Sequence, residues 1–402
     1  KKNSQVIYII LFIYLLYLTI KFDILGGKRY KMMHFYIIIV GLILISGFRY
    51  RLGTDTYAYM REFNEYHDLF HMNMEDFSVW RYQPLWILLN SLARTVGGFV
   101  LVQFVVSILH VWLWGSVIRR LAPSLIFSSL LFYYIFDYAT FNMEVMRESV
   151  AVSCFLMALL ALDKGRIMRM SVYMLIAFLF HSFSLVVSVL FLLYFKFLSR
   201  RIILSVFFVM CTAIVCIVEK NFIIELIANY MVGTDAMYVD AAIDYAQSDK
   251  YGETFLSWKG VLVVFISPIF YLITLFMVRK CYYLYVNLEY RIFSSAIILS
   301  SMFILLRYSL AIIDRMCNYF HVFTFLLLAL LFRVLCERVE KCKQRVLVFM
   351  ILISIPVFFA CKQYSRKDGL VDTERNYSRY YPYSSIFYKI EDCKREKIFS
   401  YK

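Results

Sequence analysis

Charged residues, glycine and proline are all scarce in this sequence. Asp, Glu, Lys and Arg make up 18% of its 402 residues, hydrophobic residues make up 62%, and there are only 13 glycines and 5 prolines. A soluble domain is typically about a quarter charged and about half apolar. The low charge therefore excludes an ordinary soluble domain. The sequence also has no low-complexity stretch, no internal repeat and no Ser/Gly-rich linker.

Motifs for metals, cofactors and nucleotides are also missing. The nine cysteines stand singly, and their spacing resembles neither a zinc site nor a disulfide framework. Cys361 and Cys393 could pair, but nothing in the sequence requires it. We find no P-loop, no GxGxxG, no HExxH and no nucleophile elbow. We therefore expect no cofactor and no metal, and cytosolic nucleotide chemistry is not indicated.

Apolar runs separated by short charged stretches dominate the sequence. A membrane-spanning helix needs about 20 mostly apolar residues, and many of the runs approach that length. The pattern predicts an all-α polytopic membrane protein with about 10–12 transmembrane helices. We expect a transmembrane domain over residues 1–361 and an extracytoplasmic tail over residues 362–402. The runs are 6–20, 32–47, 99–118, 121–136, 148–162, 173–195, 202–218, 261–278, 292–312, 316–335 and 346–361.

The net charge of +15 lies in short clusters between the apolar runs. A soluble protein with this charge would suggest a nucleic-acid partner, but such clusters are typical of cytoplasmic loops under the positive-inside rule. Six clusters carry the whole +15, and the rest of the chain sums to zero. The loops 48–82 and 219–260, the N-terminus and the tail are then predicted to face outward. The clusters are 21–31, 119–120, 163–169, 196–201, 279–291 and 333–345.

Two segments do not fit simple alternation across the membrane. Segment 173–195 has a basic cluster at each end, so we expect it to enter and return as a re-entrant pair of short helices. His181 would then lie at the tip, inside the protein, because backbone at membrane depth must be helical unless it is buried. Segment 84–96 is amphipathic and should dip in or lie on the outer surface. Alternatively, both segments cross fully, which would place 119–170 on the opposite side.

The first outward loop contains a compact set of polar residues. Gly53 permits a sharp turn, and Thr54 is a plausible N-cap with Asp55 in the first helical turn. Asp55 and Tyr59 would share a helix face with Glu62. This set is either part of a functional site or a capped, solvated surface helix.

Arg147 and His181 are polar residues in strongly apolar surroundings. Arg147 lies at the edge of the run 148–162, and charged residues in such places are costly and often functional. The alternative is an arginine that extends to the interface and pairs with Glu144. His181, between two half-helices, could line a polar cavity or be a satisfied core histidine.

Arg307, Asp314 and Arg315 form another polar group, at the outer end of the run 292–312. Arg307 and Asp314 are seven residues apart and would share a face if the helix continues. They could form an ion pair within the membrane, or the arginines could bind an anion. With Arg49 and Arg147, four separate regions would place guanidinium groups at one membrane face. Arginine suits phosphate because its planar fork binds two oxygens at once.

The order of these motifs resembles a known family. Residues 49–59 are similar to the R-Y-x-x-G-T-D-x-x-x-Y signature of EpsG-type, Wzy-like polysaccharide polymerases. Other segments resemble that family's motifs in the same order along the chain. One departure is Glu148, where glutamine is usual. An acid there would oppose an anion or add an acid/base group. The other segments are 82–85, 142–151, 180–182, 314–315 and 381–383.

The resemblance implies a GT-C-like, multi-pass glycosyltransferase of the bacterial inner (cytoplasmic) membrane. Its active site would face the periplasm or exterior and transfer the growing glycan from undecaprenyl diphosphate to a lipid-linked repeat unit. The implied partners are that lipid-linked oligosaccharide, membrane lipid and a chain-length regulator protein, with no nucleic acid. The product would be an O-antigen, a capsule or an exopolysaccharide.

Roles for individual residues follow as expectations. Arg147 and Arg315 would bind the diphosphate, since cations at a developing charge are usually the largest catalytic term. Asp55 or His181 would deprotonate or orient the acceptor hydroxyl. The remaining candidates for substrate binding are Arg49, Arg51, Tyr57, Tyr59 and Arg307, and the tyrosines could instead belong to an interface belt.

Three other functions fit part of the pattern. A lipid-linked oligosaccharide flippase would also need arginines, but in a central cavity open to both faces. A membrane acyltransferase could use His181, although its histidine should lie near the cytosol. A glycan ligase would share the donor chemistry and use another acceptor.

Overall fold

The chain is almost entirely helical where the structure describes it. The computed structural model describes residues 6–53, 55–74, 76–77, 83–218, 258–308, 313–364, 367–369, 376–380 and 382–390. Most of the predicted outer loop 219–260 therefore lies outside the described residues. The only strands among the described residues are β1 (Lys367–Gly369) and β2 (Asn376–Ser378), which pair antiparallel.

Several helices are long and apolar enough to cross a membrane. By length and composition these are Val6–Ile24, Phe99–Leu121 and Asp314–Glu337, and shorter apolar helices of 10–17 residues accompany them. The chain is therefore a helical, polytopic membrane protein, as its composition predicts. The run predicted over 6–20 extends to Ile24 because a π-helical turn, η2 (Thr19–Ile24), continues α1 (Val6–Leu18).

The chain folds into two compact units, each made of segments that are separate in sequence. The first unit comprises Lys1–Ser182, Tyr285–Asn287 and Ala329–Lys402; the second comprises Phe183–Leu284 and Leu288–Leu328. The first unit contains α1, η2, the strands and part of α20 (His321–Glu337), from Ala329 onward. Its other helices are α2 (Lys31–Gly47), α3 (Thr56–Glu65), α5 (Pro84–Val96), α6 (Phe99–Leu121), α7 (Ile126–Phe136), α8 (Tyr138–Met143), α9 (Met146–Asp163), α10 (Ile167–Phe180) and α21 (Cys342–Tyr364).

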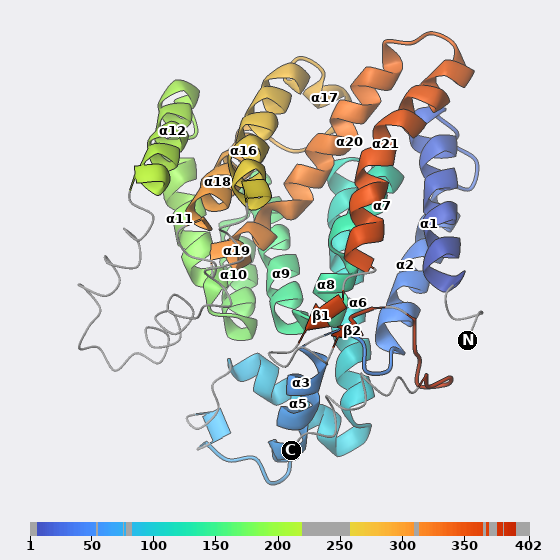
Figure 1. Ribbon diagram of the computed structural model, residues 1–402. Helices are drawn as coiled ribbons and strands as arrows, with labels where there is room; N and C mark the ends of the chain where they lie inside the picture. The colour runs from blue at the N-terminus through green and yellow to red at the C-terminus, as the bar shows by residue number, and fades with distance from the viewer. Residues whose placement is uncertain are drawn as a thin grey trace. The chain divides into compact units, whose positions relative to one another are not determined.

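Helix α9 is the core of the first unit. It packs against α6, α8 and α10, which surround it in Figure 1. Nearly every residue from Met146 to Ala161 is buried, which is expected of a helix that is enclosed on all sides. The polar residues of α9 also have partners there: His110 of α6 donates from Nδ1 to the carbonyl oxygen of Ser149 at 2.9 Å and lies 2.8 Å from Ser153 Oγ.

Helices α3 and α5 lie together at one end of the first unit, at the bottom of Figure 1. Trp86 of α5 contacts the ring of Tyr59 of α3, with centroids 5.3 Å apart. At the other end of α5, Arg94 donates to the carbonyl oxygens of Phe63 and Asn64. Both ends of the 13-residue α5 therefore contact α3, and whether the segment 84–96 crosses the membrane stays a prediction.

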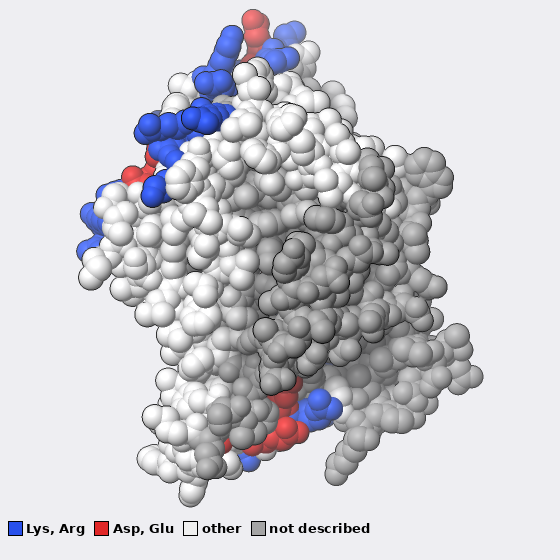
Figure 2. Space-filling model, turned by 90° about the vertical axis from the view of Figure 1, so that its left-hand side faces the viewer, with Lys and Arg blue, Asp and Glu red and all other residues white. Residues whose placement is uncertain are grey.

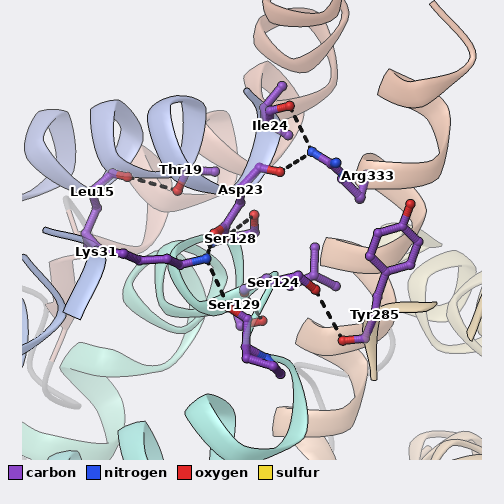
Figure 3. A network of polar contacts seen from close by, with 12 residues as sticks. Leu15, Thr19, Asp23, Ile24, Lys31, Ser124, Ser128, Ser129, Tyr285 and Arg333 are labelled. Carbon is purple, nitrogen blue, oxygen red and sulfur yellow. Dashed lines mark hydrogen bonds and ion pairs between the residues drawn. The ribbon is translucent and has the colours of Figure 1, made fainter. Parts of the chain in front are cut away.

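A polar network joins separate segments at the opposite end of the first unit (Figure 3). The buried carboxylate of Asp23, in η2, accepts hydrogen bonds from the backbone N–H and hydroxyl of Ser128 and pairs with Lys31 at 3.2 Å. Lys31 also donates to the carbonyl oxygen of Pro123, and Arg333 donates to those of Asp23 and Ile24. The network thus brings together segments from or beside the basic clusters 21–31, 119–120 and 333–345.

Figure 2 shows how charge is distributed on one surface. Lys and Arg side chains gather at the top of that view, with a few acidic side chains among them. This is the pattern that the positive-inside rule predicts for a polytopic membrane protein.

The second unit is built around α18 (Tyr290–Leu306). Helices α11 (Phe183–Phe197), α12 (Ile202–Val218) and α16 (Trp258–Val278) pack on it. Arg291 of α18 is held by the hydroxyl of Ser199 and by the carbonyl oxygen of Phe195, which it reaches at 2.5 and 2.6 Å. The short helices α17 (Tyr282–Tyr285), α19 (Asp314–Cys317) and η5 (Asn318–Phe320) and the first part of α20 complete the described elements.

Candidate functional site

The loop after α2 is held by the C-terminal strap, which we define as the described residues 379–390. Tyr50 N–H donates to the carbonyl oxygen of Ser384 at 2.8 Å, and Gly53 N–H to that of Arg379 at 3.0 Å. Ile386 N–H donates back to Phe48 at 2.9 Å. The strap therefore lies on the same face of the first unit as the loop, as the outward assignment of both segments predicts.

Gly53 is needed where this loop meets the end of α8. Its φ is +89°, and a Cβ at this position would lie 2.2 Å from the carbonyl oxygen of Met143. That oxygen already accepts a hydrogen bond from the hydroxyl of Thr56 at 2.9 Å. Backbone therefore packs directly on backbone here, and the contact sets the position of the start of α3.

Gly53→Ala is expected to destabilise the first unit by about 3 kcal/mol, because it adds the strain of a positive φ to a clash with backbone atoms that cannot rotate away. Thermal unfolding of the purified protein in detergent measures the loss. Gly98→Ala is the matched control: Gly98 also has a positive φ, +78°, but nothing lies within 4 Å of its Cβ position. Equal losses in the two variants would contradict the role assigned to the Met143 contact.

Arg49 is a buried cation rather than a surface group. Its side chain is 1% exposed, and its guanidinium donates to the carbonyl oxygen of Ser46 and contacts the sulfur of Met146. No carboxylate among the described residues pairs with it, and its Nε has no hydrogen-bond partner there. Burial lowers the pKa of Arg49 to about 10, so it stays protonated at neutral pH. A substrate cannot touch this side chain in the arrangement seen, although the sequence suggested substrate binding.

The other candidates from this loop differ in exposure. Arg51 is half-buried, has a φ of +50° and lies over the ring of Tyr50. Asp55 and Tyr57 are also half-buried, whereas Tyr59 is buried against Trp86. Asp55 occupies the N-cap position of α3 without a side-chain capping bond. The N-cap is therefore one residue later than the predicted Thr54, which lies outside the described residues.

Arg147 lies where two helices begin. It is the second residue of α9, and its Nη1 is 3.4 Å from Oε1 of Gln83, the N-cap residue of α5. The first turn of a helix carries free N–H groups and the positive end of the helix dipole. The starts of α5 and α9 therefore add to the positive charge of the half-buried Arg147, and the combination is suited to an anion.

His181 meets an acidic partner from α9. The helix breaks as predicted between α10 and α11, where His181 is extended with φ −157° and ψ 119°. Its Nε2 is 4.0 Å from Oε2 of Glu148, and both side chains are almost fully buried. The predicted burial of His181 is confirmed. Since Glu148 follows Arg147 directly, an acid/base pair adjoins the cationic position on the first turn of α9.

The contacts of some polar residues in this region were missed by sequence reasoning. Glu144, proposed from sequence as a partner of Arg147, pairs with Arg379 of the strap at 3.2 Å. Two hundred and thirty-five positions separate these residues, so no local spacing could have revealed the pair. Gln83 precedes a proline, and its position before a helix was the only available signal. Glu148 was noticed only as a departure from the family pattern.

Arg307 and Arg315 belong to the second unit and are described there by themselves. Arg307 Nη1 pairs with Asp314 Oδ1 at 2.7 Å, which is the ion pair considered from sequence. Arg307 follows α18, which ends at Leu306, and Asp314 is the first residue of α19. Arg315 is half-buried in α19.

Comparison with known proteins identifies a family. No curated protein and no solved structure is similar to the chain. The sequence model of the EpsG family matches residues 32–385, which include the loop at Arg49, the start of α9, the break at His181 and part of the strap. The match covers most of the chain and agrees with the motif order from residue 49 to residue 383. The protein belongs to the EpsG family.

Proposed function

We propose that this membrane protein polymerises lipid-linked oligosaccharide repeat units on the outer face of the bacterial inner membrane. Membership of the EpsG family points to a polysaccharide polymerase-type role. The observation that carries the finer proposal is the first turn of α9, where Arg147 lies at two helix starts and Glu148 pairs with His181. These contacts support a proposed anion site next to a proposed acid/base pair, which are the two groups that glycosyl transfer from a diphosphate requires.

The reaction is written with one bond formed and one broken. The acceptor hydroxyl of a lipid-linked repeat unit attacks the anomeric carbon of the donor glycan. The bond from that carbon to the diphosphate oxygen breaks, and its electron pair leaves with undecaprenyl diphosphate. Arg147 and the starts of α5 and α9 stabilise the negative charge that develops on the diphosphate. The hydroxyl proton passes to His181, and the nearby Glu148 carboxylate supports the ring as it becomes charged. Because His181 is almost fully buried in the arrangement seen, this step requires that acceptor binding expose its ring.

The remaining candidates take supporting roles in this proposal. Asp55 is the N-cap residue of α3 and Tyr57 lies in its first turn. Both are half-buried, so they are suited to contacts with the sugars of the acceptor. Arg51 suits a phosphate or sugar oxygen. Arg49 acts through its charge from a buried position. The anion-binding roles of Arg307 and Arg315 stay predictions from the sequence; within the second unit, Asp314 holds Arg307.

The proposal is tested with purified protein in nanodiscs and an undecaprenyl-diphosphate-linked repeat unit. A ladder of lengthened glycans on a gel is the expected product. Movement of the lipid-linked unit across the bilayer without lengthening would identify a flippase, and transfer only to a different acceptor would identify a ligase. Consumption of an acyl donor would identify an acyltransferase. Each of these outcomes would reject polymerisation.

Glu148→Gln is expected to move the acidic limb of the polymerisation pH profile to lower pH. A carboxylate near an imidazole favours the protonated ring, and His181 must be unprotonated to accept a proton. Removing the Glu148 charge therefore makes the His181 base available at lower pH. The maximal rate falls, because the carboxylate no longer supports the imidazolium that develops on His181. Initial rates measured from pH 5 to 9 give the profile.

Asp163→Asn is the control for this pH shift, because it makes the same type of change at the far end of α9. Its profile should match that of the unmodified protein. A Glu148→Gln profile with an unmoved acidic limb would show that His181 is not the base, and the same series on Asp55→Asn would then test the other candidate.

A further inference from the structure

An apolar pocket opens on the first unit between α1, α7 and α21. Its volume is about 290 Å³, and it is lined by residues of these three helices that include Tyr8, Phe12, Tyr134, Val357 and Tyr364. The residues from Val357 to Tyr364 extend along α21 for about 10 Å at the helical rise per residue. The pocket wall therefore follows α21 for about two helical turns.

The tyrosines present their rings to this pocket and use their hydroxyls elsewhere. The Tyr134 hydroxyl donates to the carbonyl oxygen of Tyr8 at 2.9 Å, and the Tyr364 hydroxyl donates to the carbonyl oxygen of Tyr134 at 2.8 Å. These bonds join α1 to α7 and α7 to α21. They also satisfy the polar atoms of the wall, so the pocket offers carbon atoms and favours a hydrocarbon over water.

The pocket lies next to the loop and strap of the candidate site. Tyr8 contacts the ring of Tyr383 in the strap, with centroids 5.7 Å apart, and the Tyr383 hydroxyl donates to the carbonyl oxygen of Ile45 near the end of α2. Tyr134 stacks on Tyr138, whose hydroxyl donates to Leu42. The pocket therefore belongs to the same end of the first unit as the loop that carries Arg49.

Charge near the pocket selects the kind of lipid. The buried Arg49 donates to the carbonyl oxygen of Ser46, next to Ile45, which accepts from the Tyr383 hydroxyl. Its side-chain partners among the described residues are that oxygen and the sulfur of Met146, and neither is a carboxylate. An uncompensated cation in a poorly solvated region attracts anions over several ångströms. A lipid with an anionic headgroup and a hydrocarbon chain complements both features, whereas a neutral lipid complements only the pocket walls.

We propose that this pocket binds the first isoprene units of the undecaprenyl diphosphate carrier, next to its headgroup. The inference rests on the proposed function, because that function supplies a polyprenyl diphosphate as the substrate carrier. The chain would lie between α1 and α21, with its diphosphate at the level of the loop that carries Arg49. Bound in this way, the carrier is fixed at its first units while the remaining chain stays in the bilayer.

Ala360→Trp fills the pocket from the α21 side, since Ala360 is one of its lining residues. Ile355→Trp is the matched control: it adds the same ring to the same helix, at a side chain that is 65% exposed and outside the pocket lining. Both proteins are reconstituted in phosphatidylcholine nanodiscs with a polyprenyl diphosphate that carries a diazirine on its second isoprene unit. Illumination, proteolysis and mass spectrometry locate the adducts, and thermal unfolding checks that each variant is folded.

The unmodified protein and Ile355→Trp should give adducts on the peptides that contain residues 8–12 and 357–364. Ala360→Trp should lower their yield about tenfold, because the chain loses most of its buried apolar contact there. Adducts elsewhere, or an unchanged yield in a folded Ala360→Trp protein, would overturn the proposal. Equal competition by phosphatidylglycerol would also overturn it, by showing that the pocket takes acyl chains.

The labelling experiment separates this inference from the proposed function, because it needs no turnover. Pocket labelling without glycan lengthening would retain the polyprenyl site and reject polymerisation. Glycan lengthening with labelling outside the pocket would support polymerisation and reject the polyprenyl site. If Ala360→Trp also raises the KM for the lipid-linked unit while Ile355→Trp does not, the pocket is used during the reaction.

Discussion

Arg147→Ala should abolish glycan lengthening while the protein still inserts and folds. Arg147 is the only guanidinium among the described residues that lies in the first turn of α9, and its Nη1 reaches Gln83 at the start of α5. Removing a preorganised charge from a developing anion typically lowers turnover by about 10²–10³-fold. The initial rate of ladder formation in nanodiscs measures the effect. Arg147→Lys should recover part of the rate, since it restores the charge without the two-pronged geometry.

The control for this prediction is Arg61→Ala on α3. Arg61 is an exposed arginine of the same outer segment, so its loss changes the net charge equally without touching the start of α9. It should leave the ladder unchanged. Full-length polymer from Arg147→Ala would reject the anion site at α9, and an equal loss in Arg61→Ala would indicate a general effect of surface charge.

The helices were largely predictable because hydrophobic length is a local property. The run 32–47 became α2 (Lys31–Gly47), and the run 99–118 became α6 (Phe99–Leu121). The break at His181 was also predictable, since basic clusters at both ends of 173–195 are incompatible with a single crossing. The π-helical η2 was not predicted, because its register is set by the partners of Asp23 on α7 and on α2.

The candidate site was only partly predictable, because its contacts join distant segments. Spacing identified Arg147 and His181 separately, but not that Glu148 would face His181 from another helix. Arg49 was expected to face the substrate, yet the strap covers it, since Ser384 and Ile386 bond to the residues on either side. The strap comes from the other end of the sequence, so no periodic pattern in the loop indicates its presence. Residue types alone also do not show which side of the loop the strap covers.

Asp23→Ala should cost about 3–5 kcal/mol of stability, because it breaks a buried ion pair from one side. Asp23 acts as a distant N-cap for α7: its carboxylate accepts from the backbone N–H of Ser128, in the first turn, at 2.7 Å, while Leu125 at the N-cap position provides no side-chain cap. The substitution leaves that N–H unsatisfied and Lys31 without its carboxylate. Asp23→Asn keeps an acceptor oxygen and should lose roughly half as much.

Thermal unfolding in detergent compares Asp23→Ala with Lys28→Ala, an exposed change in the same basic cluster that should be nearly neutral. The double variant Asp23→Ala/Lys31→Ala should lose less than the sum of the single losses, because it leaves no unpaired charge. If Asp23→Ala loses no more stability than Lys28→Ala, the capping role of Asp23 is rejected. Since Asp23 lies at the opposite end of the first unit from Arg147, the folded fraction of Asp23→Ala should lengthen glycans at the normal rate, which separates a structural network from the catalytic one.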